Sequence, residues 1–445
     1  MDASSFFSGL ARDRENGKSA GVYSVCSANP IVLEASMDHA RRENRPLLIE
    51  STSNQVNQYG GYTGMRPGDF AAFVRDIASR SGFDGENLIL GGDHLGPLVW
   101  KDMPEDEAMK RAAELVGAYV EAGFTKIHLD TSMRLSCDPS SQVLPDDIIA
   151  ERGASLCAVA EEAYKKRARL VPASKPVYVI GSEVPVPGGA QEEKSDGLTP
   201  TSPSDFRASY EAFERAFERH GLEDAWGRTV AFVVQPGVEF NGETIFDYDR
   251  GAASELCEAL RNIGRPLVFE GHSADYQRTE SLSKMVEDGV AILKVGPGLT
   301  FAMREGLIAL EHIERELAAL HSLDPSNFSA ALESAMMADD SNWKGHYHGD
   351  AESLRLQRRY SFFDRARYYL PVPEVDLSVK KLLGNLARVG IGLSLLSQYL
   401  PRSFEKARGG RLSVSPMELL KDCVREALSP YSQACAGEGN PRWRE

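Results

Sequence analysis

The sequence is poor in cysteine, and its cysteines follow no pairing pattern. The six of them are scattered through 445 residues, and no two form a C-x-x-C pair. A disulfide framework or a zinc knuckle needs closely spaced, paired thiols, so neither is expected. Scattered thiols are typical of a reducing compartment, and we expect a cytoplasmic protein.

Long apolar runs and an excess of positive charge are also missing. No stretch approaches the roughly 20 apolar residues of a membrane span, and residues 1–18 lack the apolar core of a secretory signal. Lys and Arg number 50 against 65 Asp and Glu, a formal net charge of −15. Long-range repulsion then disfavours nucleic acid and anionic membranes as partners, although a local cluster of Arg or Lys can still hold a small anion. We expect neither a nucleic-acid nor a membrane partner.

What the sequence does contain is a series of eight short apolar runs in its first 300 residues. They occupy residues 21–26, 46–50, 87–94, 126–130, 176–183, 229–235, 266–272 and 291–296. Most are followed by a helical stretch, of which 69–81, 106–122 and 204–220 are clear examples. Apolar runs without alternation are typical of strands covered on both faces. Eight of them separated by helices predict a (β/α)8 TIM barrel, whose chemistry lies at the C-terminal ends of the strands.

The remaining third of the chain has a different sequence pattern. The length exceeds the roughly 250 residues of a typical barrel, and no convincing strand follows residue 304. Helical periodicity covers 304–320, 326–339, 351–370, 377–388 and 416–428. We expect residues 1–303 to form the barrel and residues 304–445 to form a helical extension packed on it. A long connection, 184–203, is either a functional loop over the barrel mouth or a surface insertion.

Polar side chains gather where the predicted strands end. They are Asn29, Glu50, Asn54, Asp93, His94, Asp130, Ser182, Glu183, Gln235, Glu239, Glu270, His272, Ser273, Asp275 and Lys294. One polar residue at a strand end is ordinarily a helix cap or a loop hydrogen-bonding group. Because most of the strands supply one, we predict a polar site at this end of the barrel, with Asp93, Asp130 and Glu183 as candidate catalytic residues.

Two short motifs suggest a metal. In Gly91-Gly92-Asp93-His94 the glycines would let a ligand approach the backbone, and the Asp and His offer a proton carrier beside a metal ligand. In Glu270-Gly271-His272 the two side chains project to the same side of a strand. The predicted ligands are Glu270 and His272 together with His94, a nitrogen and oxygen set that suits zinc or manganese. The alternative is that Glu270 pairs with Lys294 of the next strand.

Two further features suggest binding of phosphate. Gly296-Pro297-Gly298 follows the last strand, where many barrels hold a phosphate on backbone N–H groups, although such a turn alone has little specificity. A basic cluster in the extension consists of Lys344, Arg355, Arg358, Arg359, Arg365 and Arg367. It could fold over the barrel mouth and clamp a phosphate, or it could be a solvated helix face or a set of ion pairs.

Seven segments together resemble a known family. They are residues 90–98, 127–133, 181–190, 266–276, 347–349, 360–369 and 377–386. The chain is similar to the class II, metal-dependent fructose- and tagatose-bisphosphate aldolases, and most of all to the non-catalytic Z subunit of tagatose-1,6-bisphosphate aldolase. The likeness to the Z subunit runs from the first strand to the helix near residue 386 and includes the extension.

The resemblance also assigns roles, with departures. It implies a catalytic Asp and a zinc-binding His at Asp93 and His94. It puts Glu270 where the catalytic aldolases have a zinc histidine, leaves the strand at Gln235 without another, and puts Gly296 where they have an Asn. These losses argue against ordinary zinc-aldolase chemistry. They leave as the alternative a rearranged metal site that uses His94, Glu239, Glu270 or His272. The expected substrate- or phosphate-binding residues are Gly188, Gly189, Gly271, Ser273, Asp275, Lys294, Gly296 and Arg365.

Three functions are then compatible with the sequence. The resemblance implies an accessory subunit that stabilises a class II tagatose-bisphosphate aldolase by binding its folded form. The lost zinc ligands favour that role, and the dense polar ring disfavours it. The second is a metal-dependent ketose or ketose-phosphate epimerase or aldolase, and the third is a sugar-phosphate binding protein without turnover. A kinase, an activity sometimes assigned to this family, is not expected, because no P-loop or kinase motif occurs. Homo-oligomer formation is left open.

Overall fold

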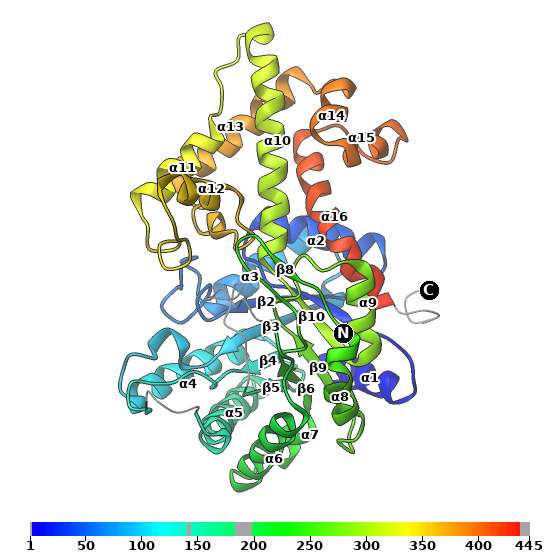
Figure 1. The fold of residues 1–445 in the computed structure, drawn as a ribbon. Coiled ribbons are helices and arrows are strands. Elements are labelled where there is room, and N and C mark those ends of the chain that lie inside the picture. The colour runs from blue at the N-terminus through cyan, green and yellow to red at the C-terminus, as the bar shows by residue number, and fades with distance from the viewer. Residues whose placement is uncertain (1, 140–143, 183–197, 437–445) are drawn as a thin grey trace.

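A computed structural model describes residues 2–139, 144–182 and 198–436, and it contains the predicted barrel (Figure 1). Eight parallel strands close in the order β1-β10-β9-β6-β5-β4-β3-β2. Their bounds are β1 Val22–Val25, β2 Leu47–Thr52, β3 Leu88–Leu95, β4 Lys126–Leu129, β5 Val177–Ile180, β6 Thr229–Val234, β9 Val268–Gly271 and β10 Val290–Val295. Nearly every strand residue is buried, because helices cover the outer face and side chains fill the interior. All eight predicted strands are confirmed.

Helices follow the strands and surround them. They are α2 Pro30–Arg42, α3 Pro67–Arg80, α4 Glu105–Ala122, α5 Asp146–Ala168, α6 Pro203–Arg219, α8 Arg250–Arg261 and α9 Thr279–Asp288, with a short α7 Glu223–Gly227. Local chemistry sets their ends. The side chain of Asn29 accepts hydrogen bonds from the N–H groups of Ile31 and Val32 at the start of α2. Gly123, at φ 91°, ends α4 in the left-handed conformation that glycine adopts without strain.

One helix outside the repeating pattern closes the floor of the barrel. Helix α1 (Ala3–Glu15) buries Phe6, Phe7 and Leu10 in a cluster with inward-facing strand residues such as Leu48 and Val179. This cluster is apolar and lies away from the C-terminal strand ends. The two ends of the barrel therefore differ: one is sealed by hydrophobic packing and the other carries polar side chains.

The extension begins without a break from the barrel. Helix α10 (Pro297–His321) follows the last strand and passes through residue 304, the expected division, and then rises away from the barrel (Figure 1). The remaining elements are α11 Phe328–Ala338, α12 Ala351–Tyr360, η3 Arg365–Tyr368, α13 Pro373–Val389, α14 Leu393–Tyr399, α15 Pro401–Arg408 and α16 Pro416–Ala436. The described part of the extension contains no strand, as predicted. Where one helix was expected over 351–370, α12 ends at Tyr360 and Asp364 adopts φ 44°.

The last helix returns to the barrel and fills the place of an eighth barrel helix. The hydroxyl of Tyr431 in α16 donates to the carbonyl of Ala274 (2.7 Å), and Arg425 pairs with Asp38 of α2 (3.1 Å). Because α10 leaves the barrel wall, α16 covers the strands between α2 and α9 instead. The extension is therefore part of the barrel's outer layer.

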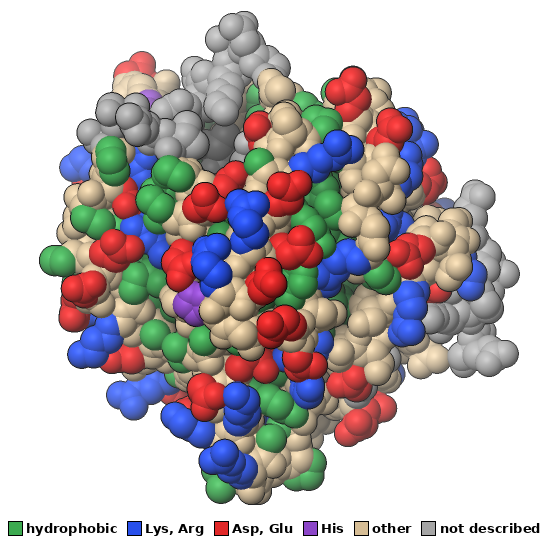
Figure 2. Space-filling view, turned by 90° about the horizontal axis from the view of Figure 1, so that it is seen from below, with side chains coloured by type: hydrophobic (Ala, Val, Ile, Leu, Met, Phe, Trp, Pro, Cys, Tyr) green, Lys and Arg blue, Asp and Glu red, His purple; other side chains and the backbone are tan. Residues whose placement is uncertain are grey.

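Two further properties concern the surface. In the space-filling view from below, acidic and basic side chains are interspersed, so the negative net charge is not concentrated on that face (Figure 2). A search of the described helices finds none that is both long and apolar enough to cross a bilayer.

Candidate active site at the mouth of the barrel

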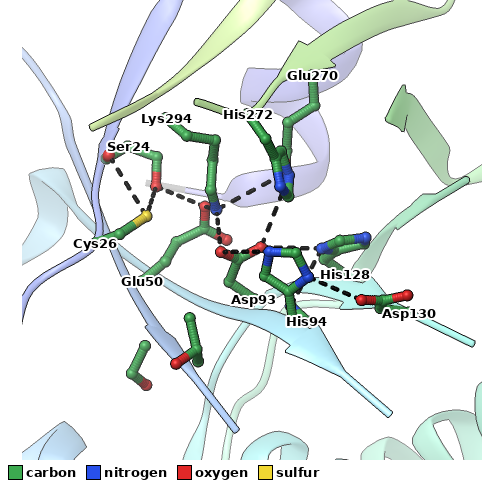
Figure 3. A network of polar contacts seen from close by, with 12 residues as sticks. Ser24, Cys26, Glu50, Asp93, His94, His128, Asp130, Glu270, His272 and Lys294 are labelled. Atoms are coloured by element: carbon green, nitrogen blue, oxygen red, sulfur yellow. Dashed lines mark hydrogen bonds and ion pairs between the residues drawn. The ribbon is translucent and has the colours of Figure 1, made fainter. Parts of the chain in front are cut away.

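Four buried side chains meet at the C-terminal ends of three strands. Asp93 comes from β3, His128 from β4, Glu270 from β9 and His272 from the residue after β9 (Figure 3). One potential ligand atom from each lies within 4.8 Å of those of the other three. Two imidazoles and two carboxylates form a donor set that suits zinc or manganese, so this group of four could hold a metal ion.

The predicted metal set and the observed group share Glu270 and His272. His94 lies beside the group, with its ring centroid 4.8 Å from that of His272, but its Nδ1 is engaged by Asp130. Glu239 is on β7 (Glu239–Phe240), which forms a small hairpin with β8 (Ile245–Phe246) that was not predicted. An oxygen of Glu239 accepts a hydrogen bond from the N–H of Phe240, and the residue lies outside the group of four.

Beneath this group lies a buried network of ion pairs. Lys126 Nζ lies 2.7 Å from Glu50 Oε1 and 2.6 Å from Glu270 Oε2. Lys294 Nζ lies 2.9 Å from Asp93 Oδ2, contacts Glu50 directly, and is 3.8 Å from Glu270 Oε1. The pairing of Glu270 and Lys294 considered as an alternative therefore exists only at long range, and Lys126 is the closer partner of Glu270.

The glycines of the Gly91-Gly92 pair make room for this network. In strand register Glu50 is opposite Gly91, and Gly91 is opposite Lys126. A Cβ at Gly91 would lie 2.5 Å from Glu50 Oε1, so the missing side chain lets Glu50 reach across to Lys126. A Cβ at Gly92 would lie 2.5 Å from Leu95 Cδ1. In this structure the two glycines admit the protein's own side chains.

The ion pairs fix the charges of the site. Burial alone would raise the pKa of Asp93, but Lys294 and the site histidines hold it well below its ordinary value. Burial likewise opposes ionisation of Glu270, and Lys126 and Lys294 hold its pKa low. Burial would lower the pKa of Lys294, yet the surrounding carboxylates raise it well above the ordinary value. The carboxylates and Lys294 are therefore charged at neutral pH.

His94 and Asp130 form a second pair beside the group. His94 Nδ1 lies 2.8 Å from Asp130 Oδ2, while Asp130 Oδ1 accepts hydrogen bonds from the N–H (3.1 Å) and hydroxyl (2.7 Å) of Ser132. Burial would raise the pKa of Asp130, but these contacts hold it at about 2. Despite burial, Asp93 and Asp130 raise the pKa of His94, whereas burial lowers that of His272 to about 4. The two imidazoles thus differ in their affinity for a proton.

A cavity of about 430 Å³ opens above these residues, within the range of small-molecule sites. Barrel and extension both line it. Among the predicted site residues, those that line it are Asn54, Asp93, His94, His272, Ser273, Asp275, Lys294, Gly296 and Arg365. Asp130 and Glu270 lie behind this layer. At Gly271 a Cβ would lie 2.7 Å from Val290 Cγ1, so that glycine serves packing. Glu183, Gly188 and Gly189 fall outside the described residues.

Five of the six members of the basic cluster in the extension divide into two kinds; the sixth, Arg359, has a buried Nε without a hydrogen-bond partner among the described residues. Arg355, Arg358 and Lys344 pair with acidic side chains of the extension, Glu352, Glu333 and Asp340. Arg365 and Arg367 line the cavity, on either side of Ala366 in η3. Both guanidinium carbons lie 4.6 Å from the ring centroid of Tyr368. Three members of the cluster therefore form ion pairs, which was one of the two interpretations. Two members lie at the barrel mouth, as the interpretation of a phosphate clamp requires.

Sequence reasoning missed His128, Lys126 and Arg367 as site residues. Lys126 and His128 stand four and two positions before Asp130 on a single strand, and side chains two apart share a face. Because Asp130 was already identified as a strand-end residue, this spacing was the available signal. Arg367 was recognised only as one member of a basic cluster.

The comparisons with known proteins agree with the resemblance. The family described as D-tagatose-1,6-bisphosphate aldolase subunit GatZ/KbaZ-like matches residues 7–436. The structure of a probable tagatose 6 phosphate kinase from Sinorhizobium meliloti 1021 is similar, with 43% identity and a TM-score of 0.83, over 93% of this chain and 100% of that chain.

More distant structures match with low scores. A fructose-bisphosphate aldolase from Campylobacter jejuni is 13% identical, with a TM-score of 0.42 over 87% of this chain and 93% of that one. The fructuronate-tagaturonate epimerase UxaE from Cohnella laeviribosi is also 13% identical, with a TM-score of 0.42 over 95% and 82%. No conclusion about function is drawn from matches with scores this low. Because the family model matches nearly the whole length of this chain, the chain belongs to the D-tagatose-1,6-bisphosphate aldolase subunit GatZ/KbaZ-like family.

Proposed function

We propose that this barrel is itself catalytic: a metal-assisted enzyme that cleaves a ketose phosphate by an aldol-type reaction or inverts its C4 centre. The observation that carries the proposal is the buried group of Asp93, His128, Glu270 and His272 at the base of a cavity lined by further ionisable groups. A protein that only supported a partner enzyme would gain nothing from burying such charges, because burial of charge is costly.

The donor chemistry of the four residues fits a divalent metal. The two carboxylates are ionised, and burial holds His272 neutral, the form of imidazole that binds metals. A bound divalent ion would act as a Lewis acid toward the ketose carbonyl.

His94 is the proposed proton carrier. Asp130 holds its Nδ1, so Nε2 is the nitrogen left to exchange a proton with a substrate in the cavity. In a ketose, transfer of the C4 hydroxyl proton to Nε2 accompanies breakage of the C3–C4 bond, whose electron pair moves toward the C2 carbonyl. If the aldehyde rotates to present its other face, attack by C3 of the enediolate re-forms the C3–C4 bond, the C4 oxygen takes the proton back from Nε2, and the product is the C4 epimer. If the aldehyde leaves instead, protonation of the enediolate at C3 completes the cleavage.

Lys294 is proposed to act as a fixed positive charge. An aldolase that forms a Schiff base needs a lysine that loses its proton readily, by desolvation or beside another cation. Lys294 instead lies among Asp93, Glu50 and Glu270, which raise its pKa. It therefore supports charge developing on the substrate, and the chemistry favoured here is of the metal-assisted type.

The test combines metal analysis with turnover. Protein purified without chelator is analysed for metals, and then incubated with D-tagatose 6-phosphate and D-fructose 6-phosphate while NMR follows epimers and cleavage products. We expect a stoichiometric divalent metal and turnover. His94→Gln should keep the metal and lose at least about 100-fold in kcat, the lower range for a general acid or base.

A matched control is His312→Gln, since His312 stacks on Tyr399 of the extension, 5.6 Å between ring centroids, and does not line the cavity. It should turn over like the unmodified protein. A metal-free protein that converts neither sugar, or unchanged turnover in His94→Gln, would reject the proposal.

The second candidate is the accessory subunit. It is supported by the matched family, which is named after an aldolase subunit, and by exposed apolar side chains on the extension. Of the twelve large hydrophobic residues exposed in the described chain, six lie there: Leu320, Met337, Leu356, Tyr360, Leu377 and Leu393. Exposed apolar surface is a common feature of protein interfaces.

The accessory role is tested with purified proteins. A class II tagatose-bisphosphate aldolase is heated alone and with an excess of this chain, and its residual activity is followed over time. A partner that binds only the folded enzyme lengthens its half-life in proportion to the complex formed. An unchanged half-life, with no complex on size-exclusion chromatography, rejects this role.

A further inference from the structure

We infer that the cavity accepts a ketose with one anionic end, held by Arg365 and Arg367, and that the turn after the last strand offers no second anion site for a bisphosphate. The inference rests on the proposed function in that it takes a ketose as the ligand. Two observations carry it: the usual phosphate position after the last strand is closed by a carboxylate, and two arginines at the cavity wall form no direct ion pair with a carboxylate among the described residues.

The closed position is the start of α10. Oδ1 of Asp275 accepts hydrogen bonds from the N–H groups of Gly296 (2.9 Å) and Gly298 (2.7 Å). Pro297 between them has no N–H to offer. These are the backbone donors on which a phosphate after the last strand of a barrel would be held. In this chain a buried carboxylate already uses them.

The surroundings of Asp275 are shaped to keep it there. Its side chain is buried, and a Cβ at Gly298 would lie 3.0 Å from Asp275 Oδ1, so the glycine leaves space for the carboxylate. A phosphate at this point would have to displace Asp275 and would then meet its negative charge. The sequence-based expectation of a phosphate on Gly296 is therefore replaced by an internal cap.

The arginines present the opposite situation. Arg365 is 8% exposed, and in the described part of the chain neither it nor Arg367 forms a direct ion pair with a carboxylate. Asp364 and Asp275 act on Arg367 only through their charge at longer range. Their hydrogen bonds go to neutral groups: Nε of Arg365 donates to the carbonyl of Asn342, and Nη2 of Arg367 donates to the hydroxyl of Tyr368 (3.1 Å).

Two guanidinium groups at a cavity wall, neither in a direct ion pair with a carboxylate, are suited to an anion. A buried charge is costly unless a counter-charge meets it, and a guanidinium binds phosphate or carboxylate through two parallel hydrogen bonds. Burial and the charge of Arg367 both lower the pKa of Arg365, and an anion bound to both guanidinium groups would offset that repulsion. Phosphate and carboxylate share this chemistry, so a ketose 6-phosphate and a ketohexuronate are the two ligand types.

The experiment is calorimetric titration of the full chain with D-tagatose 6-phosphate, D-tagatose 1,6-bisphosphate, D-tagaturonate and D-tagatose. D-Tagatose 6-phosphate and D-tagaturonate each carry a single anionic group and are called monoanionic sugars here in that sense. We expect at least one of them to bind about tenfold tighter than both the bisphosphate and D-tagatose. Their relative affinities tell whether phosphate or carboxylate is preferred. A bisphosphate that binds as tightly as the better monoanionic sugar overturns the inference.

Variants test the two ends separately. Arg365→Gln should weaken the binding of the better monoanionic sugar by about tenfold or more and leave the binding of D-tagatose unchanged. Arg355→Gln, at a surface pair with Glu352, should change neither affinity. Asp275→Ser frees the two N–H groups and should improve bisphosphate binding relative to the monoanionic sugar. If Arg365→Gln binds the better monoanionic sugar as tightly as the unmodified chain does, the assignment of Arg365 to the anion is overturned. If Asp275→Ser does not fold, the relative affinities of the unmodified chain for the four ligands still test the inference.

Failure of this inference is distinguishable from failure of the proposed function. Selective binding of one monoanionic sugar without turnover supports the inference and rejects catalysis. Turnover of a tightly bound bisphosphate supports catalysis and overturns the inference.

Discussion

Glu50 is the carboxylate on which the buried ion pairs of the site converge. It is fully buried, receives Lys126 and Lys294, and accepts a hydrogen bond from the hydroxyl of Ser24 (2.5 Å). Removing one charge of a buried set leaves the others uncompensated, which costs about 3 to 5 kcal/mol. We therefore expect Glu50→Gln to lower the free energy of unfolding by about that amount, measured as a lower urea midpoint.

The control for Glu50 is an ion pair of the same type on the surface. Glu162 and Lys165, 2.7 Å apart on α5, are exposed, and such pairs add little to stability because water and salt screen them. Glu162→Gln should leave the midpoint unchanged. Equal midpoints for Glu50→Gln and the unmodified protein would show that the buried network does not contribute to stability.

Asp275 provides a pH dependence with a definite sign. Burial raises its pKa to about 6, although the N–H groups of Gly296 and Gly298 oppose the shift. In the unfolded chain an aspartate titrates near 4, so the folded state binds the extra proton. The stability from this group is present below about pH 4 and is lost as the pH rises through 6, by roughly 2 to 3 kcal/mol.

Asp275→Asn isolates that contribution, because an amide oxygen can still accept both hydrogen bonds but does not titrate. The unmodified protein should lose stability relative to this variant between pH 4.5 and 7.5, measured as the difference in urea midpoint at each pH. A difference that changes in the opposite direction would mean that the backbone donors stabilise the carboxylate more than burial destabilises it.

At the level of residues, the sequence predicted the ring of polar side chains but not their partners. Asp93, His94, Glu270 and His272 were identified because strand ends are recognisable from local pattern. Which of them meet depends on strand register and on side chains two positions deeper, such as His128. The capture of the Gly296 and Gly298 N–H groups by Asp275 depends on how a loop folds back, which local pattern does not encode.

At the level of elements, α16 shows what local pattern could and could not predict. Its helical character was predicted over 416–428, and the structure extends it to Ala436. Its place in the barrel wall was not predicted, because that place results from the departure of α10. The β7–β8 hairpin was missed for a different reason: strands of two residues are too short for a periodic signal.

The packing of α16 can be tested at Leu428. This side chain is fully buried, and truncating a buried leucine costs about 2 to 5 kcal/mol because a cavity remains. We expect Leu428→Ala to lower the urea midpoint of the whole barrel, read from the near-ultraviolet circular dichroism. Leu320→Ala is the matched control, since Leu320 in α10 is 76% exposed. A midpoint that is unchanged in Leu428→Ala would mean that α16 is not part of the cooperative unit.

At the scale of the whole molecule, barrel and extension share one functional cavity. The eight strands and most helices were predictable because each is a local pattern repeated in a fixed order. The cavity was not, because its wall combines strand ends with Arg365 and Arg367, separated from them by more than 60 residues. The division of the chain at residue 304 therefore separates elements that line the same site.

A metal bound by the group of four would connect three strands of the barrel, β3, β4 and β9, so its effect should reach the whole molecule. A ligand that binds only the folded state at 100 times its Kd adds about 2.7 kcal/mol of stability. We expect Zn²⁺ or Mn²⁺ added to chelator-treated protein to raise the thermal midpoint by several degrees. The shift should disappear in His128→Gln and persist in His220→Gln, at a partly exposed histidine that ends α6 and pairs with Glu151. Lys126 and Lys294 offer the competing outcome: if neither metal shifts the midpoint, these lysines are the cations that Asp93 and Glu270 require.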